Sequence, residues 1–306
     1  MVGTTSMLQA RPFIFAIKNF SLAIIDEASQ ILEPNIIGLL SKNTVGRFIL
    51  IGDHKQLPAV VQQSERDAQV EEQILWKIGI TDCRRSLFER LIQWERKQGR
   101  EDFIGILRKQ GRMHPEIAEW PNRMFYSREQ LIPVPLPHQL EESTEPRLVF
   151  IPSEACKEIG LSDKVNINEA HIVCEQLHHI YKRYGHLFNS QKTVGVIVPY
   201  RNQIAVIRKE IEQLEIPALL DISIDTVERY QGSQRDIIIY SFTVQNPYQL
   251  DFLTANCIIE DGHVIDRKLN VALTRARKRL ILTGNETILR QNYLFSNLID
   301  YIKKKQ

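Results

Sequence analysis

The chain has 306 residues, of which 43% are apolar and 25% are charged, and its formal net charge is +2 at pH 7. This length suffices for about two domains, and the near-neutral balance excludes a global electrostatic argument for nucleic-acid binding. The four cysteines form neither a CxxC pair nor a metal-ligand spacing, which is typical of a reducing cytosol. No apolar run approaches the ~20 residues of a membrane helix, and residues 1–10 lack a signal-peptide pattern. We therefore expect a soluble, cytoplasmic protein that has no membrane partner.

Two adjacent carboxylates follow the first clear strand. The apolar run Leu22–Ile25 predicts a buried strand with Asp26 and Glu27 at its carboxyl end. Ligands of open α/β sheets bind outside those ends. The first acid is therefore well placed to hold Mg²⁺, and the second could act as general base on a water that attacks a phosphate. The alternative is a strand exit followed by a helix cap.

The remainder of residues 1–103 alternates short strands with helices, which predicts a parallel α/β sheet. We expect a helix over Glu33–Leu40 and a second strand over Arg47–Asp53. Ser86 opens a capping box for a further helix, which Gly99 ends.

A new unit begins at Ile104. Pro115 is expected in the first turn of a helix, and the proline-rich stretch 131–147 is interpreted as an extended surface connector. Asn168 is predicted to cap a helix that ends at Gly185.

The last third of the chain continues the α/β pattern. It contains three predicted strands and two predicted helices, which complete a second domain: strands Thr193–Val198, Ile237–Phe242 and Leu280–Thr283, and helices Gln203–Leu214 and Asn270–Arg277.

Five short motifs occur in a fixed order: DEASQ at 26–30, GDHKQLPAV at 52–60, QGRMHP at 110–115, TVERYQGSQRD at 226–236 and NVALTRAR at 270–277. Together they resemble the superfamily 1 helicases, in particular the branch that includes the RNA helicase of nonsense-mediated decay and its DNA-processing relatives. The resemblance covers nearly the whole chain. It implies two RecA-like domains, a partial first one over 1–103 and a second one over 104–306, with ATP between them and single-stranded nucleic acid across their top.

The resemblance assigns roles to five residues of the ATP site. Asp26 matches the magnesium-binding acid, Glu27 the catalytic base and Gln56 the glutamine that senses the γ-phosphate. Arg112 and Arg275 match the two arginines of the second domain, and the planar guanidinium group suits charge that is spread over phosphate oxygens. Ala and Val around Arg275 imply a packed helix, in which its charge needs a partner.

Further positions match the family's contacts to nucleic acid and nucleotide. The single-strand groove would include Thr4, Thr5, Pro199, Tyr200, Thr226 and Val227. Gly232 and Gln234, in QGSQ, are assigned to the cofactor. Two positions depart from the family pattern: Gly111 replaces a common tyrosine that can stack on adenine, and Gln234 replaces an acid.

The chain contains no GxxxxGK[ST] sequence, the loop that cradles the β- and γ-phosphates. We expect this P-loop on an upstream segment of the same protein or on a separate chain, so that the first domain is truncated at its N-terminus and has sheet edges for that segment to cover. Two functions therefore compete: an ATP- and Mg²⁺-dependent motor on single-stranded DNA or RNA, or a nucleic-acid-binding module that has lost catalysis. Retention of the five ATP-site residues favours the motor.

Overall fold

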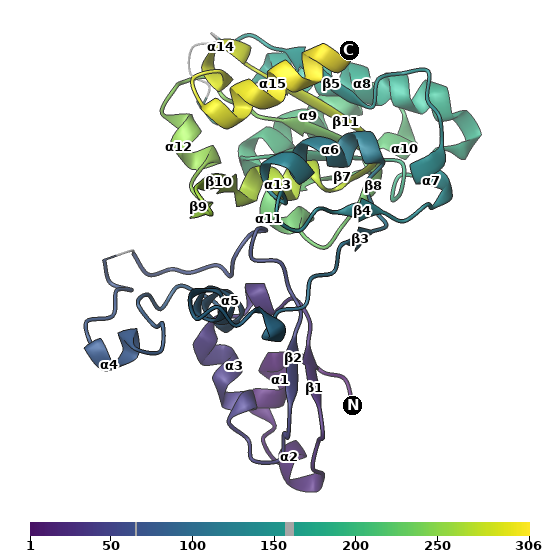
Figure 1. Ribbon diagram of the computed structural model, residues 1–306. Helices are drawn as coiled ribbons and strands as arrows, with labels where there is room; N and C mark the ends of the chain where they lie inside the picture. The colour runs from purple at the N-terminus through teal and green to yellow at the C-terminus, as the bar shows by residue number, and fades with distance from the viewer. Residues whose placement is uncertain (65, 157–161) are drawn as a thin grey trace. The chain divides into compact units, whose positions relative to one another are not determined.

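The computed structural model describes residues 1–64, 66–156 and 162–306. The chain divides into two compact units, Met1–Ile106 and Leu107–Gln306 (Figure 1). No helix of the described residues is long and apolar enough to cross a membrane.

The first unit is built on two parallel strands, β1 (Ala23–Ile25) and β2 (Phe48–Leu50), with Ile24 opposite Ile49. The predicted strands are therefore present, although each pairs over only three residues. The predicted helix over 33–40 is confirmed as α3 (Glu33–Leu40). The other elements are α1 (Thr5–Ala10), α2 (Ile14–Ile17), η1 (Ala28–Gln30), α4 (Gln73–Trp76), α5 (Leu87–Lys97) and η2 (Glu101–Phe103).

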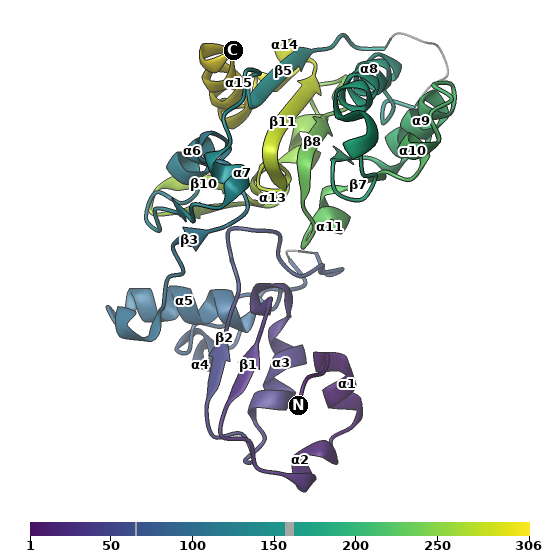
Figure 2. The same ribbon diagram turned by 90° about the vertical axis from the view of Figure 1, so that its right-hand side faces the viewer.

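One face of this small sheet carries exposed apolar side chains. Helices α1 and α3 lie together on one side of β1 and β2 (Figures 1 and 2). Side chains alternate between the two faces of a strand, so Leu22, Ile24, Ile49 and Ile51 share one face. Ile24 is 62% exposed and Ile49 is 48% exposed, and Leu22 and Ile51 are exposed as well. The first unit therefore leaves the apolar surface of this face open.

The second unit contains a five-stranded sheet in the order β5-β11-β8-β6-β7. All four strand pairs are parallel, which confirms the predicted α/β class. The sequence predicted the three central strands, β6 (Val194–Val198), β8 (Arg235–Ser241) and β11 (Ala276–Gly284). It did not predict the two edge strands, β5 (Leu148–Pro152) and β7 (Ser223–Thr226).

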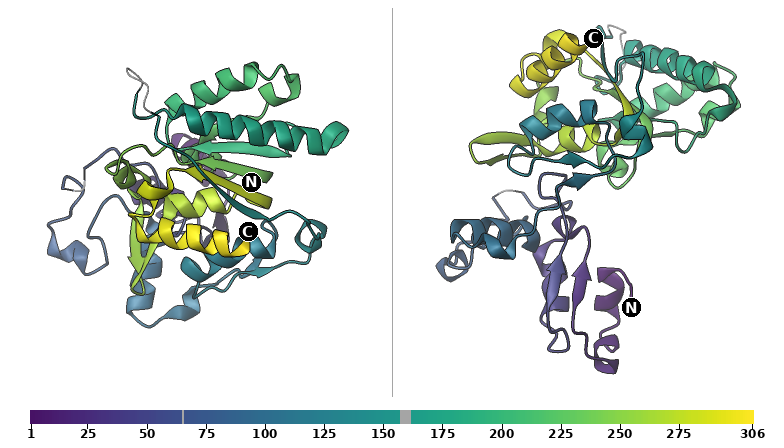
Figure 3. Two further views of the ribbon diagram at one scale, coloured as in Figure 1. Left: turned by 90° about the horizontal axis from the view of Figure 1, so that it is seen from above. Right: turned by 45° about the vertical axis from the view of Figure 1, so that its right-hand side comes forward.

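Helices cover both faces of this sheet, as Figures 2 and 3 show. On one face, α8 (Ile167–Tyr184) and α9 (Arg201–Glu212) bury an aliphatic core that includes Val196 and Ile239. On the other face lie α6 (Pro115–Met124), α13 (Arg267–Leu273) and α15 (Tyr293–Lys305). The smaller elements are β3 (Lys109–Gln110), β4 (Ile132–Pro133), α7 (Pro137–Leu140), η3 (Gly185–Leu187), α10 (Pro217–Leu220), α11 (Val227–Tyr230), α12 (Gln249–Leu253), β9 (Cys257–Glu260), β10 (His263–Asp266) and α14 (Glu286–Leu289).

A glycine allows α11 to cross the sheet closely. A Cβ atom at Gly195, on β6, would lie 1.8 Å from the hydroxyl oxygen of Tyr230. That hydroxyl donates to the carbonyl oxygen of Ser223 at 3.1 Å and accepts from the Ser223 side chain at 2.7 Å. The segment between β7 and β8 is thereby fixed against β6.

The structure corrects the predicted start of α8. Asn166, not Asn168, is the N-cap residue, and its side-chain oxygen accepts a hydrogen bond from the Glu169 amide at 3.2 Å. The side chain of Asn168 instead donates to the carbonyl oxygen of Glu154. The predicted end at Gly185 is confirmed.

The prediction of a helix over 270–277 is also wrong at the C-terminal end of that helix. Helix α13 stops at Leu273, and β11 begins at Ala276. Thr274 is the C-cap residue, and its amide and its hydroxyl both donate to the carbonyl oxygen of Asn270, at 3.1 and 2.7 Å. Arg275 therefore lies between a helix and a strand.

The stretch 131–147 is only in part the extended surface connector that its prolines suggested. Most of its residues are exposed and irregular, but it also contains β4 and α7, and His138 and Gln139 are buried. The Gln139 amide donates to the carbonyl oxygens of Gln110 and Met113, at 3.1 and 2.8 Å. These bonds attach the stretch to the segment that leads into α6.

Candidate functional site

The acid pair occupies a sharply bent loop after β1. The Glu27 amide donates to Asp26 Oδ1 at 2.9 Å, and the backbone of Glu27 is left-handed, with φ of 51°. A residue with a side chain adopts this conformation only where its surroundings compensate for the strain. Gln30 Nε2 donates to Glu27 Oε2 at 2.6 Å, and the Ala28 amide donates to the carbonyl oxygen of Ile51 at 2.8 Å. Both carboxylates are thus held at the carboxyl end of the sheet.

The loop after β2 contacts the acid-pair loop. The Asp53 amide donates to the Ser29 hydroxyl at 3.3 Å, and a Cβ atom at Gly52 would lie 2.9 Å from the Ser29 nitrogen. Gln56 Nε2 donates to Asp53 Oδ2 at 2.9 Å, so Asp53 orients the Gln56 side chain. Asp26, Glu27 and Gln56 therefore lie on two adjoining loops at one sheet edge.

Asp26 offers a suitable oxygen ligand for a divalent cation. Its side chain is exposed, and Mg²⁺ prefers one or two carboxylates together with waters and substrate phosphates. Within the described residues no group of three or more His, Cys, Asp or Glu side chains forms a cage of protein ligands. The donor set therefore fits magnesium held jointly with a phosphate.

In the second unit, Arg112 and Gln234 come together although they are 122 residues apart. Arg112 Nε donates to Gln234 Oε1 at 3.1 Å, and its NH1 group donates to the carbonyl oxygen of Thr274 at 3.3 Å. The ring of His138 lies 2.9 Å from the Arg112 carbonyl oxygen. Three of the motifs thus meet at the amino ends of β8 and β11.

Arg275 adjoins this group and is buried, with 1% of its surface exposed. Its Nε donates to the carbonyl oxygen of Val271 at 3.0 Å, and its NH2 group donates to the Thr274 hydroxyl at 3.0 Å. The partner that a packed arginine requires is thus supplied by the end of α13. Gly232 has φ of 81°, a backbone conformation that favours glycine, in the turn that leads to Gln234.

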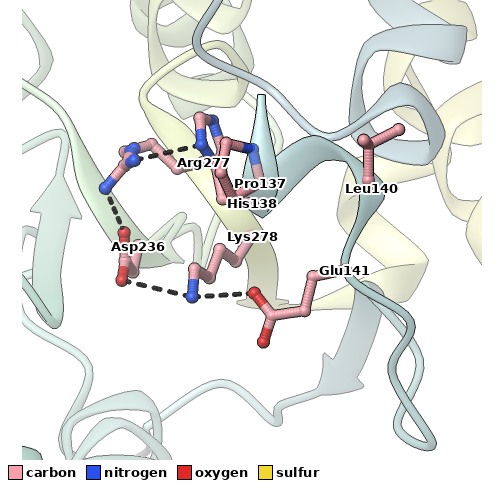
Figure 4. A pocket seen from close by; sticks show the side chains of 7 residues that line it. All are labelled: Pro137, His138, Leu140, Glu141, Asp236, Arg277 and Lys278. Atoms are coloured by element: carbon pink, nitrogen blue, oxygen red, sulfur yellow. Dashed lines mark hydrogen bonds and ion pairs between the residues drawn. The ribbon is translucent and has the colours of Figure 1, made fainter. Parts of the chain in front are cut away.

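A cavity of about 600 Å³ lies beside the Arg112 group; it is lined by Pro137, His138, Leu140, Glu141, Asp236, Arg277 and Lys278 (Figure 4). Its charges are paired with one another. Asp236 binds Arg277 at 2.6 Å, and Lys278 binds Glu141 at 2.8 Å, which lowers the pKa of the Glu141 carboxyl. Because the charges within each pair neutralise each other, we interpret this cavity as a structural feature. Its wall holds the loop that carries Arg112, through the contact of His138 with the Arg112 carbonyl oxygen.

The residues of the second unit that were predicted to contact nucleic acid gather at the opposite end of the sheet. Pro199 and Tyr200 follow β6, while Thr226 is the last residue of β7, the strand paired with β6, and Val227 follows it. Tyr200 is buried, which raises the pKa of its hydroxyl, and its ring stacks on Phe252 with centroids 5.0 Å apart. This tyrosine is therefore a poor platform for a base.

Thr4 and Thr5 lie in the first unit at the start of α1. The Thr4 hydroxyl oxygen accepts a hydrogen bond from the Met7 amide at 3.2 Å, so Thr4 caps this helix. Thr5 is its first residue.

Three residues with positioning roles were missed: Gln30, Asp53 and His138. The first two stand three residues from a candidate side chain within the same motif, a spacing at which contact in a tight turn is common. No comparable signal marked His138, because it approaches Arg112 only through the fold.

Comparisons with known proteins place these motifs in a family. Family profiles for an AAA domain match residues 1–64 and 83–287. The chain is 28% identical over 295 residues to an uncharacterized ATP-dependent helicase, MJ0104, of Methanocaldococcus jannaschii, covering 93% of this chain and 39% of that protein. It is 30% identical to the DNA replication ATP-dependent helicase/nuclease DNA2 of Xenopus laevis, covering 93% of this chain and 26% of that protein. It is 31% identical to the regulator of nonsense transcripts 1 of Dictyostelium discoideum, covering 94% of this chain and 20% of that protein.

The chain thus spans less than half of the length of these relatives. Among solved structures, an arterivirus nonstructural protein 10 (helicase) in complex with DNA aligns with a TM-score of 0.40 at 15% identity, covering 94% of this chain and 43% of that one.

Proposed function

Because the chain belongs to the AAA-domain helicases of superfamily 1, we propose that it forms the hydrolytic and strand-binding part of an ATP-driven motor on single-stranded nucleic acid. The observation that carries the proposal is the hydrogen-bonded contact between the loop after β1 and the loop after β2. The Ser29–Asp53 hydrogen bond sets two carboxylates and an oriented amide at one sheet edge, where α/β proteins bind their ligands. A module that only binds nucleic acid has no use for this arrangement.

Each residue of the first unit has a role in the proposed reaction. Asp26 holds Mg²⁺, which, when bound, offsets negative charge on the phosphates of ATP. Glu27 accepts a proton from the attacking water, and Gln30 keeps its carboxylate in place. Gln56 donates its amide to the γ-phosphate from the orientation that Asp53 gives it.

The second unit supplies positive charge and the nucleotide contacts. Arg112 and Arg275 stabilise the charge that develops on the equatorial phosphate oxygens. Gly232 and Gln234 contact the nucleotide, and the Arg112–Gln234 hydrogen bond supports this assignment because it groups the two sites. The pairs Pro199–Tyr200 and Thr226–Val227 contact the single-stranded nucleic acid at the opposite end of the sheet.

No GxxxxGK[ST] sequence, the loop that cradles the phosphates with its amides, occurs among the given residues. We propose that a P-loop segment, on the same protein or on a separate chain, packs on the first unit. The exposed apolar face with Ile24 and Ile49 supports this, since a parallel sheet is normally covered on both faces.

The test is ATP hydrolysis by the chain joined to a P-loop segment, measured with and without DNA and RNA oligomers. We expect turnover that single strands stimulate, and none from the chain alone, which serves as the matched control. Glu27→Gln should lower turnover about 10²–10⁴-fold while ATP still binds. Strand binding without hydrolysis in the joined protein would instead identify a binding module, and a Glu27→Gln variant with more than half of the normal turnover would exclude Glu27 as the base.

A further inference from the structure

A second cavity, of about 380 Å³, opens where β6 ends and α9 begins; it is lined by Asp163, Lys164, Pro199, Tyr200, Arg201, Asn202, Tyr248, Gln249 and Phe252. It combines apolar rings with both donors and acceptors of hydrogen bonds. Only Pro199 and Tyr200 of its lining were expected from the motifs to touch nucleic acid.

The three aromatic rings of this cavity differ in what they can still contact. Tyr200 and Phe252 stack on each other, and Lys268 Nζ lies 3.9 Å from the centre of the Phe252 ring. Those two rings are therefore engaged. Tyr248 is 60% exposed, and among the described residues no ring packs against it. Its face is available to a planar ligand.

Tyr248 is also held in position. Its hydroxyl donates to the carboxylate of Asp163. The next residue, Gln249, is buried, and its side chain accepts from the amides of Gln245 and Asn246 at 2.8 and 2.9 Å and donates to the carbonyl oxygen of Asp163 at 2.9 Å. A ring that is already ordered loses little conformational entropy when a base stacks on it.

The rim of the cavity suits a phosphate. Lys164 and Arg201 are exposed and line it. Arg201 is also the first residue of α9, a helix of 12 residues whose N-cap residue, Tyr200, makes no side-chain capping bond. Amides at a helix N-terminus that lack a cap favour an anion.

We propose that one unpaired nucleobase of the bound strand stacks on Tyr248, while its phosphate lies between Lys164, Arg201 and the N-terminus of α9. This rests on the proposed function and names the aromatic contact that Tyr200 cannot provide. The ring recognises the π-face that every base has, so the contact does not depend on sequence.

The test is binding of fluorescein-labelled oligothymidine and oligouridine to residues 1–306, measured by fluorescence anisotropy. Tyr248→Ala should weaken binding about 5- to 150-fold, the range that corresponds to one lost base–aromatic stack. Tyr248→Phe retains the ring and should bind nearly as the unchanged protein does. Tyr293→Ala is the matched control, because Tyr293 is 72% exposed on the same unit, at the start of α15.

An oligomer with abasic positions separates the base from its phosphate: it should bind the unchanged protein and Tyr248→Ala equally. Photo-cross-linking of 5-bromouracil to the unchanged protein, read by mass spectrometry, should label Tyr248, and this result does not depend on the folding of a variant. Equal affinity of Tyr248→Ala and the unchanged protein for oligothymidine, or cross-links that avoid Tyr248, would overturn the stacking inference alone. If the unchanged protein binds neither oligothymidine nor oligouridine, the nucleic-acid binding in the proposed function is excluded together with the stacking inference.

Discussion

Glu169 carries a carboxyl group that the fold removes from water completely. Its Oε2 atom accepts hydrogen bonds from the Ser241 hydroxyl at 2.6 Å and from the Thr243 amide at 2.8 Å, and its Oε1 atom accepts one from the Ser153 hydroxyl at 3.2 Å. Burial outweighs these bonds and raises the pKa of Glu169 from about 4.5 to about 7. Folding therefore favours the protonated acid.

This gives the stability of the second unit a pH dependence. Because the folded pKa lies above the unfolded one, the contribution is fully present below about pH 4.5 and is lost as the pH rises through about 7. Glu169→Gln cannot titrate, so raising the pH from 5 to 8 should cost the unchanged protein roughly 2–3 kcal/mol relative to this variant.

Urea unfolding at the two pH values measures the difference. Glu175→Gln, on the exposed side of the same helix, is the control and should follow the unchanged protein. Parallel pH curves for Glu169→Gln and the unchanged protein would contradict the shift.

At the scale of elements, two asparagines at the start of α8 look alike in the sequence but have different roles in the structure. Asn166 is fully buried: its oxygen caps the helix, its Nδ2 group donates to the Glu154 carbonyl oxygen at 3.0 Å, and its amide donates to Gln203 at 2.8 Å. Asn168 is exposed. The cap therefore joins α8 to the start of α9.

Asn166→Ala should lower the free energy of unfolding of the second unit by about 1–2 kcal/mol, the upper part of the range for a lost N-cap. Asn168→Ala should change it by less than about 0.5 kcal/mol, as is usual for surface sites. Denaturant midpoints of the two variants give the comparison, and equal losses would mean that the cap is shared between them.

Elements with a strong local signal were predictable from the sequence. Helix α3 and the three central strands of the larger sheet were located because apolar periodicity and capping residues agree there. The edge strand β7 was missed because Ser223–Thr226 is short and partly polar. The end of α13 was misplaced because the alanines around Arg275 suit either state, and pairing of Ala276 with Arg235 on β8 decides for a strand.

The candidate site shows the same division. Residues within one motif, such as Asp53 and Gln56, are adjacent in the fold, and spacing alone could have indicated their contact. The contact of Arg112 with Gln234 depends on where the strands lie in the sheet, so no local pattern contains it.

At the scale of the whole molecule, the two units differ in how much of each sheet is protected. In the second unit, helices cover both faces of five strands, and Val196 and Ile239 are fully buried. In the first, two strands of three residues leave Ile24 and Ile49 open. A two-stranded sheet is marginally stable at best.

Hydrogen exchange should resolve this difference. We expect the amides of β1 and β2 to exchange roughly 100-fold faster than those of β6 and β8, because local opening of the first unit exposes little additional apolar surface. Mass spectrometry of peptides from the two sheets measures it. Equal protection in both sheets would show that the first unit is stabilised by contacts other than its own strands.

The open face of β1 and β2 also has a consequence for the life of the protein in a cell. Leu22–Ile25 and Phe48–Ile51 are short, uncharged, proline-free apolar runs, a composition prone to intermolecular strand pairing. While nothing covers them, newly made copies compete between correct assembly and aggregation, and each run is also a suitable target for a chaperone that binds extended apolar segments. The yield of usable protein should therefore depend on how soon after synthesis the proposed P-loop segment covers this face.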